Sequence, residues 1–386
     1  MLVIVKFAVT CSVLILLVVL PAESQASQDV EEAVAQISLD SMLATVERMI
    51  AFDNRFIGSD SNSAAVSWFR ECFEGMGYAV SLDSFVVNVN TRVNGQQYTI
   101  TNLTQVNVVA ALPGLQSANK KIVLGAHYDS ISLDRDQAGQ NIAPGADDNA
   151  TGVAAVLELA RVLRNARTDV TIEFVLFGAE ELGLIGSRSR AVGEKARQEE
   201  ILVMMGLDVL GTRSTLLPSA FTLDTTSRGL SMAELVADAA ETYTDVFSRD
   251  GASDSRIMVT AVGCRCSDHQ SYLDQGFPAI GVFQYFANPA PHINMSIDTI
   301  ENVDIAYAAS ITQAVLAGTL AIGGFPSRSP DFDGSGTIDF DDFLGLAVAF
   351  GTSPVGPDET VFDLDADGSV GFTDFLIFSE NYGRTL

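Results

Sequence analysis

The sequence of 386 residues contains few basic residues, only three histidines and only four cysteines. Its 22 Lys and Arg stand against 49 Asp and Glu, and the formal charge of -27 would repel nucleic-acid phosphates and anionic membrane surfaces. Nucleic-acid binding is therefore the first function to be excluded. Low-complexity and collagen-like patterns are absent as well, and 47% of the residues are hydrophobic, so the chain can build a large core.

No apolar run in the sequence is long enough for us to expect a membrane-spanning helix. The run from Phe7 to Leu20 has 14 residues, against the roughly 20 that a spanning helix needs. Lys6 precedes this run and the small residues of Ser24-Gln25-Ala26 follow it, which is the pattern of a secretory signal peptide. We therefore expect residues 1–26 to be a signal peptide and the mature protein to be secreted, in an extracellular or periplasmic location.

The small number of cysteines limits covalent cross-linking. Beyond the signal peptide only Cys72, Cys264 and Cys266 are left, so the monomer can form at most one disulfide in an oxidising compartment. Cys72 lies in a helical pattern at residues 64–76, and we expect it to be a buried, unreactive thiol. A disulfide between Cys264 and Cys266 is sterically allowed but tight.

Apolar segments that end in polar residues predict the fold class. Alternating residues at 85–93 and 97–109 predict antiparallel strands. Fully apolar segments predict buried parallel strands, and they alternate with predicted helices. These strands are expected at 122–126, 171–178, 201–207 and 279–283, and the helices at 152–163 and 304–320. We expect a three-layer α/β/α domain with a mixed, mainly parallel central sheet.

The domain organisation follows from a change in composition. The α/β/α domain is expected over residues 27–322. Residues 323–330 read Gly-Gly-Phe-Pro-Ser-Arg-Ser-Pro, a composition typical of a linker. Residues 331–386 contain ten Asp and two Glu with a single base, Arg384, and this charge asymmetry indicates a separate module.

Histidines and acids follow directly after several predicted strands. They are His127 and Asp129, Asp147 and Asp148, Glu180 and Glu181, Asp208, and His292. The carboxyl ends of parallel strands meet at one edge of a sheet, so these side chains would line one crevice. Each group alone also fits a structural role, such as a hydrogen-bonded histidine or an acid at a helix N-terminus. Together they would bury unpaired acids without a counter-ion, which predicts a metal site. Nitrogen and oxygen ligands suit zinc, and a shared carboxylate can bridge two metals.

Eight short motifs contain or surround these residues. They are Asn54-Arg55-Phe56, Gln105 to Ala110, Gly125 to Ser130, Pro144 to Gly152, Phe177 to Gly183, Gly206-Leu207-Asp208, Cys266 to His269, and Pro291-His292. In this order they resemble the secreted dinuclear zinc exopeptidases, a family that includes bacterial leucine aminopeptidases, glutamate carboxypeptidase II and glutaminyl cyclases. The resemblance spans residues 43–320.

The resemblance implies a site with two zinc ions. One zinc would be held by His127, Asp147 and Asp208, and the other by Asp147, Glu181 and His292, with Asp147 bridging. Asp129 would fix the His127 imidazole, and Glu180 would be the general base. A hydroxide shared by the zincs would attack the scissile carbonyl, and the substrates would be peptides with a free N-terminus.

Other readings of the same motifs stay open. A glutaminyl cyclase or a carboxypeptidase of the same family is an alternative, as is an inactive, calcium-dependent binding protein. Asp147-Asp148-Asn149 looks like the aminopeptidase pattern rather than the cyclase one, and we find no basic cluster that would hold a C-terminal carboxylate. We therefore expect a zinc metalloaminopeptidase.

The loop around Cys264 and Cys266 departs from the bacterial aminopeptidases. There a longer disulfide loop encloses a tyrosine that helps to stabilise the transition state, and Arg265, Tyr272 or Tyr285 could take over this role here. The third histidine, His269, is expected to fix its loop rather than to bind metal.

The acidic C-terminal segment repeats a twelve-residue pattern, starting at Asp331 and again at Asp363. Each copy has oxygen ligands at positions 1, 3, 5 and 12, a residue at position 7 that can offer its carbonyl, and Gly at position 6, as in an EF-hand calcium loop. The expected ligands are Asp331, Asp333, Ser335, Thr337 and Asp342 in the first loop, and Asp363, Asp365, Asp367, Ser369 and Asp374 in the second.

An apolar helix is predicted after each calcium loop, at 343–350 and 375–382. This pairing, with Asp instead of Glu at position 12, resembles a type I dockerin, a small all-α module. By this resemblance the segment would attach the enzyme to a cohesin-like or cell-surface partner.

Overall fold

The computed structural model describes residues 30–384 apart from short gaps. The gaps are residues 94–95, 116, 135–141, 165, 167, 250–254, 286–289, 325–329, 334, 336, 354, 356–360 and 365–368. The expected signal peptide, most of the expected linker, and the calcium ligands Asp365 and Asp367 therefore lie outside the described residues.

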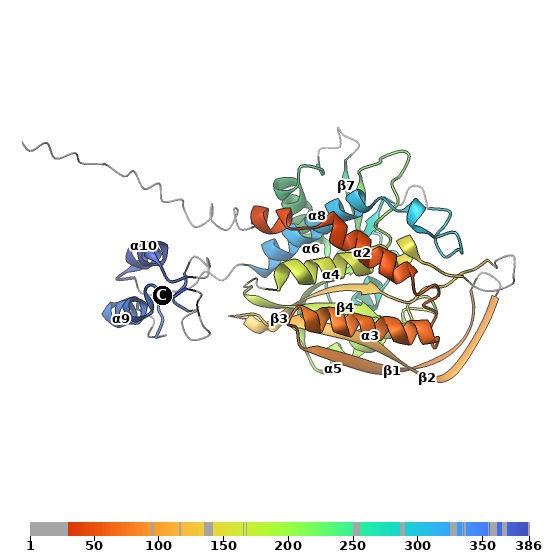
Figure 1. Cartoon of the computed structure of the whole chain (residues 1–386), viewed down its shortest axis with the longest axis horizontal. Helices are drawn as coiled ribbons and strands as arrows, with labels where there is room; N and C mark the ends of the chain where they lie inside the picture. The colour runs from red at the N-terminus through yellow and green to blue at the C-terminus, as the bar shows by residue number, and fades with distance from the viewer. Residues whose placement is uncertain are drawn as a thin grey trace, which may run out of the picture.

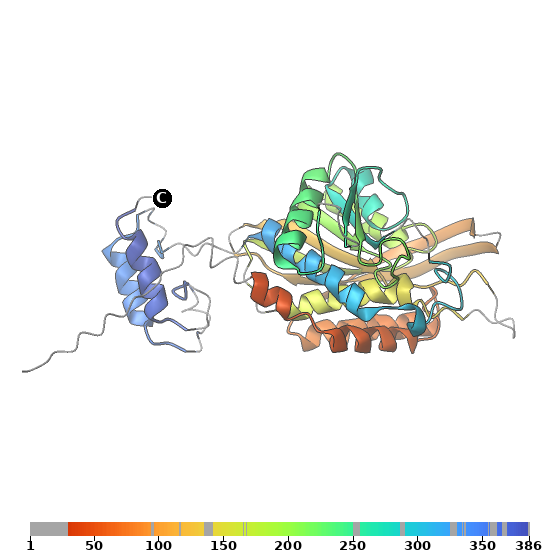
Figure 2. The same ribbon diagram turned by 90° about the horizontal axis from the view of Figure 1, so that it is seen from above.

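A mixed sheet forms the centre of the larger part of the molecule (Figures 1 and 2). The described strands are β1 (Val80–Val93), β2 (Gln96–Leu112), β3 (Ser117–His127), β4 (Val170–Phe177), β5 (Glu200–Leu207), β6 (Phe221–Asp224), β7 (Ile257–Thr260) and β8 (Ala279–Gln284). Their order in the sheet is β1-β2-β4-β3-β5-β8-β6-β7.

The central strands β4, β3, β5 and β8 pair in parallel, whereas β1 with β2, β2 with β4, and β6 with β8 pair antiparallel. The expected mixed, mainly parallel character of the centre is thus confirmed. The short strands β6 and β7, which pair in parallel with each other, were not predicted. Four residues are too few for a periodic pattern to stand out.

Helices cover both faces of the sheet. One face carries α2 (Leu39–Ile50), α3 (Asp60–Gly75), α4 (Gly152–Leu163), α6 (Leu230–Tyr243) and α8 (Ile305–Gly323), and the other carries α5 (Ile185–Ala196) and α7 (His269–Gln275). In Figure 1, α2, α3 and α4 lie together over one side of the strands.

Strand β3 shows why the central strands are apolar throughout. Ile122 and Leu124 contribute to the core beneath α4, while Val123 contributes to the opposite core with Ala191 of α5 and Tyr272 of α7. Because successive side chains point to opposite faces, a strand covered on both sides needs apolar residues at every position.

Helix α8 has the length and hydropathy of a membrane-spanning helix, the one such helix among the described residues. It has 19 residues, and an 18-residue window within it has a mean hydropathy of 1.6 and is 67% buried within the fold. It contacts α6, and Ile311, Val315 and Leu316 belong to the main core. This burial is typical of the central helix of a folded domain, whose apolar residues extend all round it.

The repeated C-terminal segment forms a small module with helices α9 (Phe340–Ala349) and α10 (Phe372–Asn381) (Figure 1). Its core contains Ile338, Leu346, Val370 and Phe378. The domain boundaries expected at 322 and 331 stay predictions, because most of the segment between them lies outside the described residues.

The two repeats of this module interlock through their backbones. Ile338, in the first loop, donates to the carbonyl of Arg384 at 2.9 Å and accepts from the N–H of Gly383 at 2.7 Å, both beyond the second helix. Val370, the equivalent residue of the second loop, makes the same pair of bonds with residues 351–352, at 2.9 and 2.7 Å. Each loop is therefore completed by the end of the other repeat.

Candidate metal centre

The ends of three neighbouring parallel strands bring the site together. His127 is the last residue of β3 and pairs in register with Phe177, the last residue of β4. Glu180 follows β4 after a two-residue turn, and Asp208 follows β5 directly. Because β3 lies between β4 and β5, these side chains emerge at one edge of the sheet, as the sequence predicted.

His127, Asp148 and Asp208 form a compact buried group. The Nε2 atom of His127 lies 3.2 Å from Oδ1 of Asp148 and 3.3 Å from Oδ1 of Asp208. The three potential ligand atoms lie within 4.8 Å of one another. One imidazole and two carboxylates at this spacing can bind a zinc ion.

Asp147 does not lie where the resemblance implied. Its Oδ1 accepts the N–H of Gly211 at 2.7 Å, and its Oδ2 accepts the hydroxyl of Thr212 at 2.6 Å. The backbone of Asp148 is extended, with φ -110° and ψ 91°, so adjacent side chains point in different directions. Asp148 therefore takes the position beside His127 that was expected for Asp147.

Asp298, which the sequence did not single out, holds this segment in place. Its carboxylate accepts the backbone N–H groups of Asp147 and Asp148, at 3.0 and 2.9 Å. Burial and the charge of Asp147 raise the pKa of Asp298 to about 7. As a single acid in a loop, Asp298 has no sequence pattern that could have marked it.

Asp129 connects the end of β3 with the loop after β4. Its carboxylate oxygens accept the N–H groups of Glu180 and Glu181, at 3.0 and 3.2 Å. Nδ1 of His127 lies 3.1 Å from the backbone carbonyl oxygen of Asp129 and 3.8 Å from its carboxylate. The expected contact with the imidazole thus runs mainly through the backbone, while the side chain positions the two glutamates.

Glu180 and Glu181 form a second potential ligand group with His127, again within 4.8 Å. Burial, together with neighbouring acids, raises the pKa of both glutamates well above the ordinary value, and His127 opposes this effect on each. Burial also disfavours the charged form of His127, but Asp208 and Glu180 outweigh it and raise the pKa of the imidazole. The carboxylates around His127 need a positive charge to remain ionised, which is what a metal would supply.

His292 lies apart from Glu181. Its Nε2 is 3.1 Å from the Thr212 hydroxyl, 3.5 Å from Oδ2 of Asp147 and 3.8 Å from Oδ1 of Asp298. The residue whose side chain contacts Glu181 is Asn294, with one terminal amide atom 2.8 and 2.9 Å from the two carboxylate oxygens. The implied set of Asp147, Glu181 and His292 is therefore not assembled, because the turn after Pro291 directs Asn294 rather than His292 to Glu181.

Arg55 connects the loop after β3 with the loop that leads to Asp148. Its fully buried guanidinium donates to the carbonyl oxygens of Tyr128, Pro144 and Gly145, at 2.8, 2.6 and 3.0 Å. Burial lowers the pKa of Arg55 to about 10, although nearby acids, Asp298 first, oppose this effect. The Asn-Arg-Phe motif of the sequence thus supplies a buried positive charge and three donors to the loops that carry Asp129 and Asp148.

The cysteines and His269 are structural. Cys264 and Cys266 form a disulfide, and Cys72 is a partly buried free thiol whose pKa burial raises to about 11. Nε2 of His269 lies 3.7 Å from Oδ2 of Asp224, which also accepts the N–H of Cys264 at 2.6 Å. His269 therefore fixes its loop, as expected.

Three residues were expected as possible replacements for the tyrosine of the bacterial aminopeptidases, and two of them contact other parts of the fold. Arg265 is exposed and pairs with Asp274 at 3.1 Å. Tyr272 is fully buried against Phe177 and Phe277. Neither side chain is available to the residues around His127.

The first acidic loop of the C-terminal module gathers Asp331, Asp333 and Asp342, with potential ligand atoms within 4.8 Å. Asp342 also accepts the N–H groups of Phe332 and Asp339, at 2.6 and 2.9 Å. Ser335 and Thr337 lie in the same loop, where the Ser335 hydroxyl donates to the carbonyl of Thr337 at 3.0 Å.

In the second loop, Asp363 and Asp374 are buried, and Asp374 accepts the N–H of Gly371 at 2.6 Å. Ser369 lies in the described part of this loop, whereas Asp365 and Asp367 fall outside it.

The family model of peptidase family M28 matches residues 107–319, which is more than half of the chain. A probable leucine aminopeptidase of Arthroderma otae is 28% identical over 291 residues, covering 74% of this chain and 72% of the relative. Leucine aminopeptidase 1 of Paracoccidioides brasiliensis is also 28% identical, covering 74% of this chain and 71% of the relative.

Solved structures share the fold. The LapA aminopeptidase of Legionella pneumophila matches with a TM-score of 0.59 and 22% identity, over 77% of this chain and 75% of that one. A zinc aminopeptidase of Bacillus subtilis matches with a TM-score of 0.60 and 17% identity, over 75% of this chain and 98% of that one. The family match covers β3 and the loops that carry His127, Asp148, Glu180 and Asp208. The chain therefore belongs to peptidase family M28.

Proposed function

We propose that the chain is a secreted zinc metalloaminopeptidase that removes N-terminal residues from peptides. The observation that carries the proposal is the buried group of His127, Asp148 and Asp208 beside Glu180 and Glu181, at the strand ends of an M28 peptidase. The leucine aminopeptidases among its relatives favour the N-terminus of the substrate as the site of cleavage.

The residues at the strand ends fit zinc. His127, Asp148 and Asp208 would hold one ion, and Asp148 and Glu181 would contribute to a second position next to it. Asp148, rather than Asp147, would then be the carboxylate that both ions share. Bound zinc would supply Lewis acidity and a water molecule of lowered pKa.

Glu180 is suited to the role of general base. It is partly exposed, lies beside His127, and has a pKa raised by burial, which makes its carboxylate a stronger base than an ordinary glutamate. It would take the proton of the attacking water and return it to the leaving amine. Asp129 supports this step, because its hydrogen bonds to the N–H groups of Glu180 and Glu181 fix the loop that carries both side chains.

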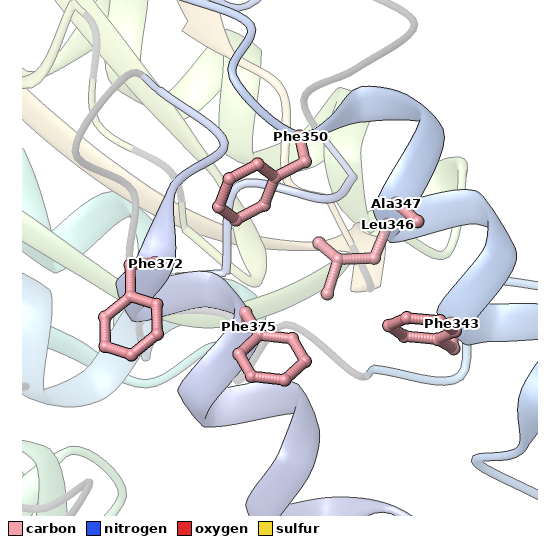
Figure 3. A pocket seen from close by; sticks show the side chains of 6 residues that line it. All are labelled: Phe343, Leu346, Ala347, Phe350, Phe372 and Phe375. Atoms are coloured by element: carbon pink, nitrogen blue, oxygen red, sulfur yellow. The ribbon is translucent and has the colours of Figure 1, made fainter.

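The C-terminal module is proposed to bind calcium and to attach the enzyme to a cohesin-like or cell-surface partner. The group of Asp331, Asp333 and Asp342 supports calcium binding. Helices α9 and α10 border an apolar groove of about 330 Å³ (Figure 3), which supports contact with a protein. The groove is lined by Phe343, Leu346, Ala347, Phe350, Phe372 and Phe375.

The test is hydrolysis of a panel of aminoacyl-p-nitroanilides, free and N-acetylated, by the protein from residue 27 onward. Release from free-amine substrates alone, lost with a chelator and restored by zinc, would support the proposal. Absence of release by zinc-loaded protein would overturn it. Assays of N-terminal glutamine cyclisation and of C-terminal cleavage would then separate the two alternative enzymes from an inactive binding protein.

A further inference from the structure

A further group of potential metal ligands lies where the end of β6 meets the loop before α7. Asp224, Cys264 and His269 each place one potential ligand atom within 4.8 Å of the other two. None of the three belongs to the potential ligand groups around His127. A carboxylate oxygen, a cysteine sulfur and an imidazole nitrogen are the atoms that zinc binds in proteins. This group therefore has the composition of a zinc site.

Regular elements fix two of the three side chains. The fully buried ring of His269, the first residue of α7, makes an edge contact with Phe283 of β8, with ring centroids 5.6 Å apart. A Cβ atom at Gly281 would lie 2.7 Å from Cε1 of His269, so strand and ring are in close contact. Asp224 ends β6 and pairs in register with Gly281. The imidazole and the carboxylate are thus positioned by β6 and β8 rather than by the cysteine loop.

The distances within the group fit a shared cation. Nε2 of His269 lies 3.7 Å from Oδ2 of Asp224 and 4.0 Å from Sγ of Cys264. The first distance is too long for a direct hydrogen bond. Two ligands of one tetrahedral zinc, with bonds of about 2.0 to 2.3 Å, would lie about 3.4 to 3.6 Å apart. Shifts of about 0.4 Å would therefore allow the three atoms to bind one ion.

The disulfide between Cys264 and Cys266 closes this group to metal, because zinc binds a thiolate and not a disulfide sulfur. Cys266 is exposed and Cys264 is only partly exposed, so a dithiol reductant reaches Cys266 more easily. Its thiolate bonds to the sulfur of Cys266, the disulfide breaks, and Cys264 leaves as a thiolate with the electron pair. The second thiol of the reductant then releases Cys266 and forms the oxidised reductant.

We propose that Asp224, Cys264 and His269 form a zinc site that exists only when the Cys264–Cys266 disulfide is reduced. With the disulfide closed, His269 fixes its loop. Reduction places a thiolate beside the Asp224 carboxylate, and a bound cation removes the repulsion between these two charges. The zinc in turn holds the Cys264 thiolate and opposes closure of the disulfide. This site is separate from the proposed catalytic centre and does not depend on peptidase activity.

Two matched cysteine variants test the site. Cys266→Ser leaves Cys264 as a thiol without any reductant, whereas Cys264→Ser leaves Cys266 instead. Both are made as the protein from residue 27 onward, kept free of oxygen and saturated with Ca²⁺, and zinc retained after dialysis is counted by mass spectrometry. We expect Cys266→Ser to hold one zinc more than the unmodified, disulfide-bonded protein. Cys264→Ser should hold the same number as the unmodified protein.

Cobalt absorption identifies the ligand. Co²⁺ bound to Cys266→Ser should show a thiolate-to-cobalt charge-transfer band, because none of the ligands proposed for the catalytic metals is a sulfur. Adding His269→Gln or Asp224→Asn to Cys266→Ser should remove the extra metal ion. Cys72 is present in every variant, so a contribution from its thiol would also appear in Cys264→Ser.

The unmodified protein gives a second measurement if Cys266→Ser does not fold. It is reduced with a dithiol, freed from the reductant without oxygen, and titrated with Co²⁺. We expect one additional metal ion with the same charge-transfer band. Equal metal counts in the two cysteine variants, or no such band in the reduced unmodified protein, would overturn the proposal. Absence of peptidase activity would count against the proposed function alone, since these counts are made without substrate.

Discussion

Nε2 of His127 lies 3.2 Å from the carboxylate of Asp148, whereas the carboxylate of the adjacent Asp147 is bonded to Gly211 and Thr212. Of these two adjacent residues, Asp148 is thus a potential metal ligand and Asp147 a supporting residue. The extended backbone of Asp148 and the hydrogen bonds that the Asp298 carboxylate accepts from the N–H groups of Asp147 and Asp148 maintain this difference.

The first prediction uses these adjacent residues as a matched pair. Asp148→Asn should lose tightly bound zinc and reduce kcat/KM at least about 100-fold, because a neutral amide replaces a charged ligand. Asp147→Asn should retain zinc and mainly lower stability, by about 1 to 2 kcal/mol, because it disturbs the bonds to Gly211 and Thr212. Zinc counts and urea unfolding of both variants check this, and loss of zinc from Asp147→Asn alone would contradict it.

The second prediction separates the two neighbouring glutamates. Glu180→Gln should keep the metal content and lower kcat by about 10²- to 10⁴-fold, since the amide cannot accept the proton of water. Glu181→Ala should lose metal from the second position. Metal counts with kinetics on one free-amine substrate distinguish them, and equal metal losses in the two variants would count against separate roles.

The third prediction concerns Arg55. Arg55→Lys keeps the charge but cannot reach all the carbonyl oxygens that the guanidinium contacts, so unfolding free energy should fall by about 3 kcal/mol or more. Arg70→Lys is the control, because Arg70 is exposed and makes a single ion pair with Glu74. Its effect on the free energy of unfolding should be much smaller than that of Arg55→Lys. Urea unfolding measures both, and similar values would refute the role of Arg55.

The fourth prediction follows from Glu194, which is buried beside Arg190 at 2.8 Å. Burial raises the pKa of Glu194 to about 7, against the opposing charge of Arg190. The folded state therefore keeps a proton that the unfolded state has lost above about pH 4.5. The titration of Glu194 should therefore lower the free energy of unfolding as the pH rises from about 4.5 to 7, by at most about 3 kcal/mol.

Urea unfolding at pH 5 and pH 7.5 tests this dependence. Glu194→Gln should flatten the fall relative to the unmodified protein, whereas Glu71→Gln, at an exposed position on α3, should not. Identical pH profiles for the two variants would show that Glu194 does not contribute.

The fifth prediction concerns calcium. If the module binds calcium at two sites as proposed, Asp342→Ala should lower the number of bound calcium ions by one, because Asp342 is buried beside Asp331 and Asp333 and accepts N–H groups of its own loop. The adjacent Asp341→Ala is the control, since Asp341 is exposed and lies outside the ligand positions. Calorimetric titration with Ca²⁺ gives the stoichiometry, and a full count of calcium in Asp342→Ala would contradict the assignment.

Much of the architecture could be predicted from residue patterns. The central strands stand out because β3, β4 and β5 are covered by helices on both faces and must be apolar throughout. His127, Glu180 and Asp208 could be placed at one edge because each follows such a strand. Strands β6 and β7 were missed because four residues carry little periodic signal, and Asp298 because a single acid in a loop has no pattern of its own.

By itself, the sequence determined the family, the mixed α/β fold and the set of side chains that gather at the strand ends. These depend on the period of apolar residues and on short local motifs. Only the tertiary structure decided which of Asp147 and Asp148 lies beside His127, and which of His292 and Asn294 contacts Glu181. In each case the outcome depends on backbone direction in an irregular loop. That direction is set by hydrogen bonds between residues distant in the chain, such as the N–H of Asp148 to the carboxylate of Asp298 and the N–H of Leu133 to the carbonyl of Asn294.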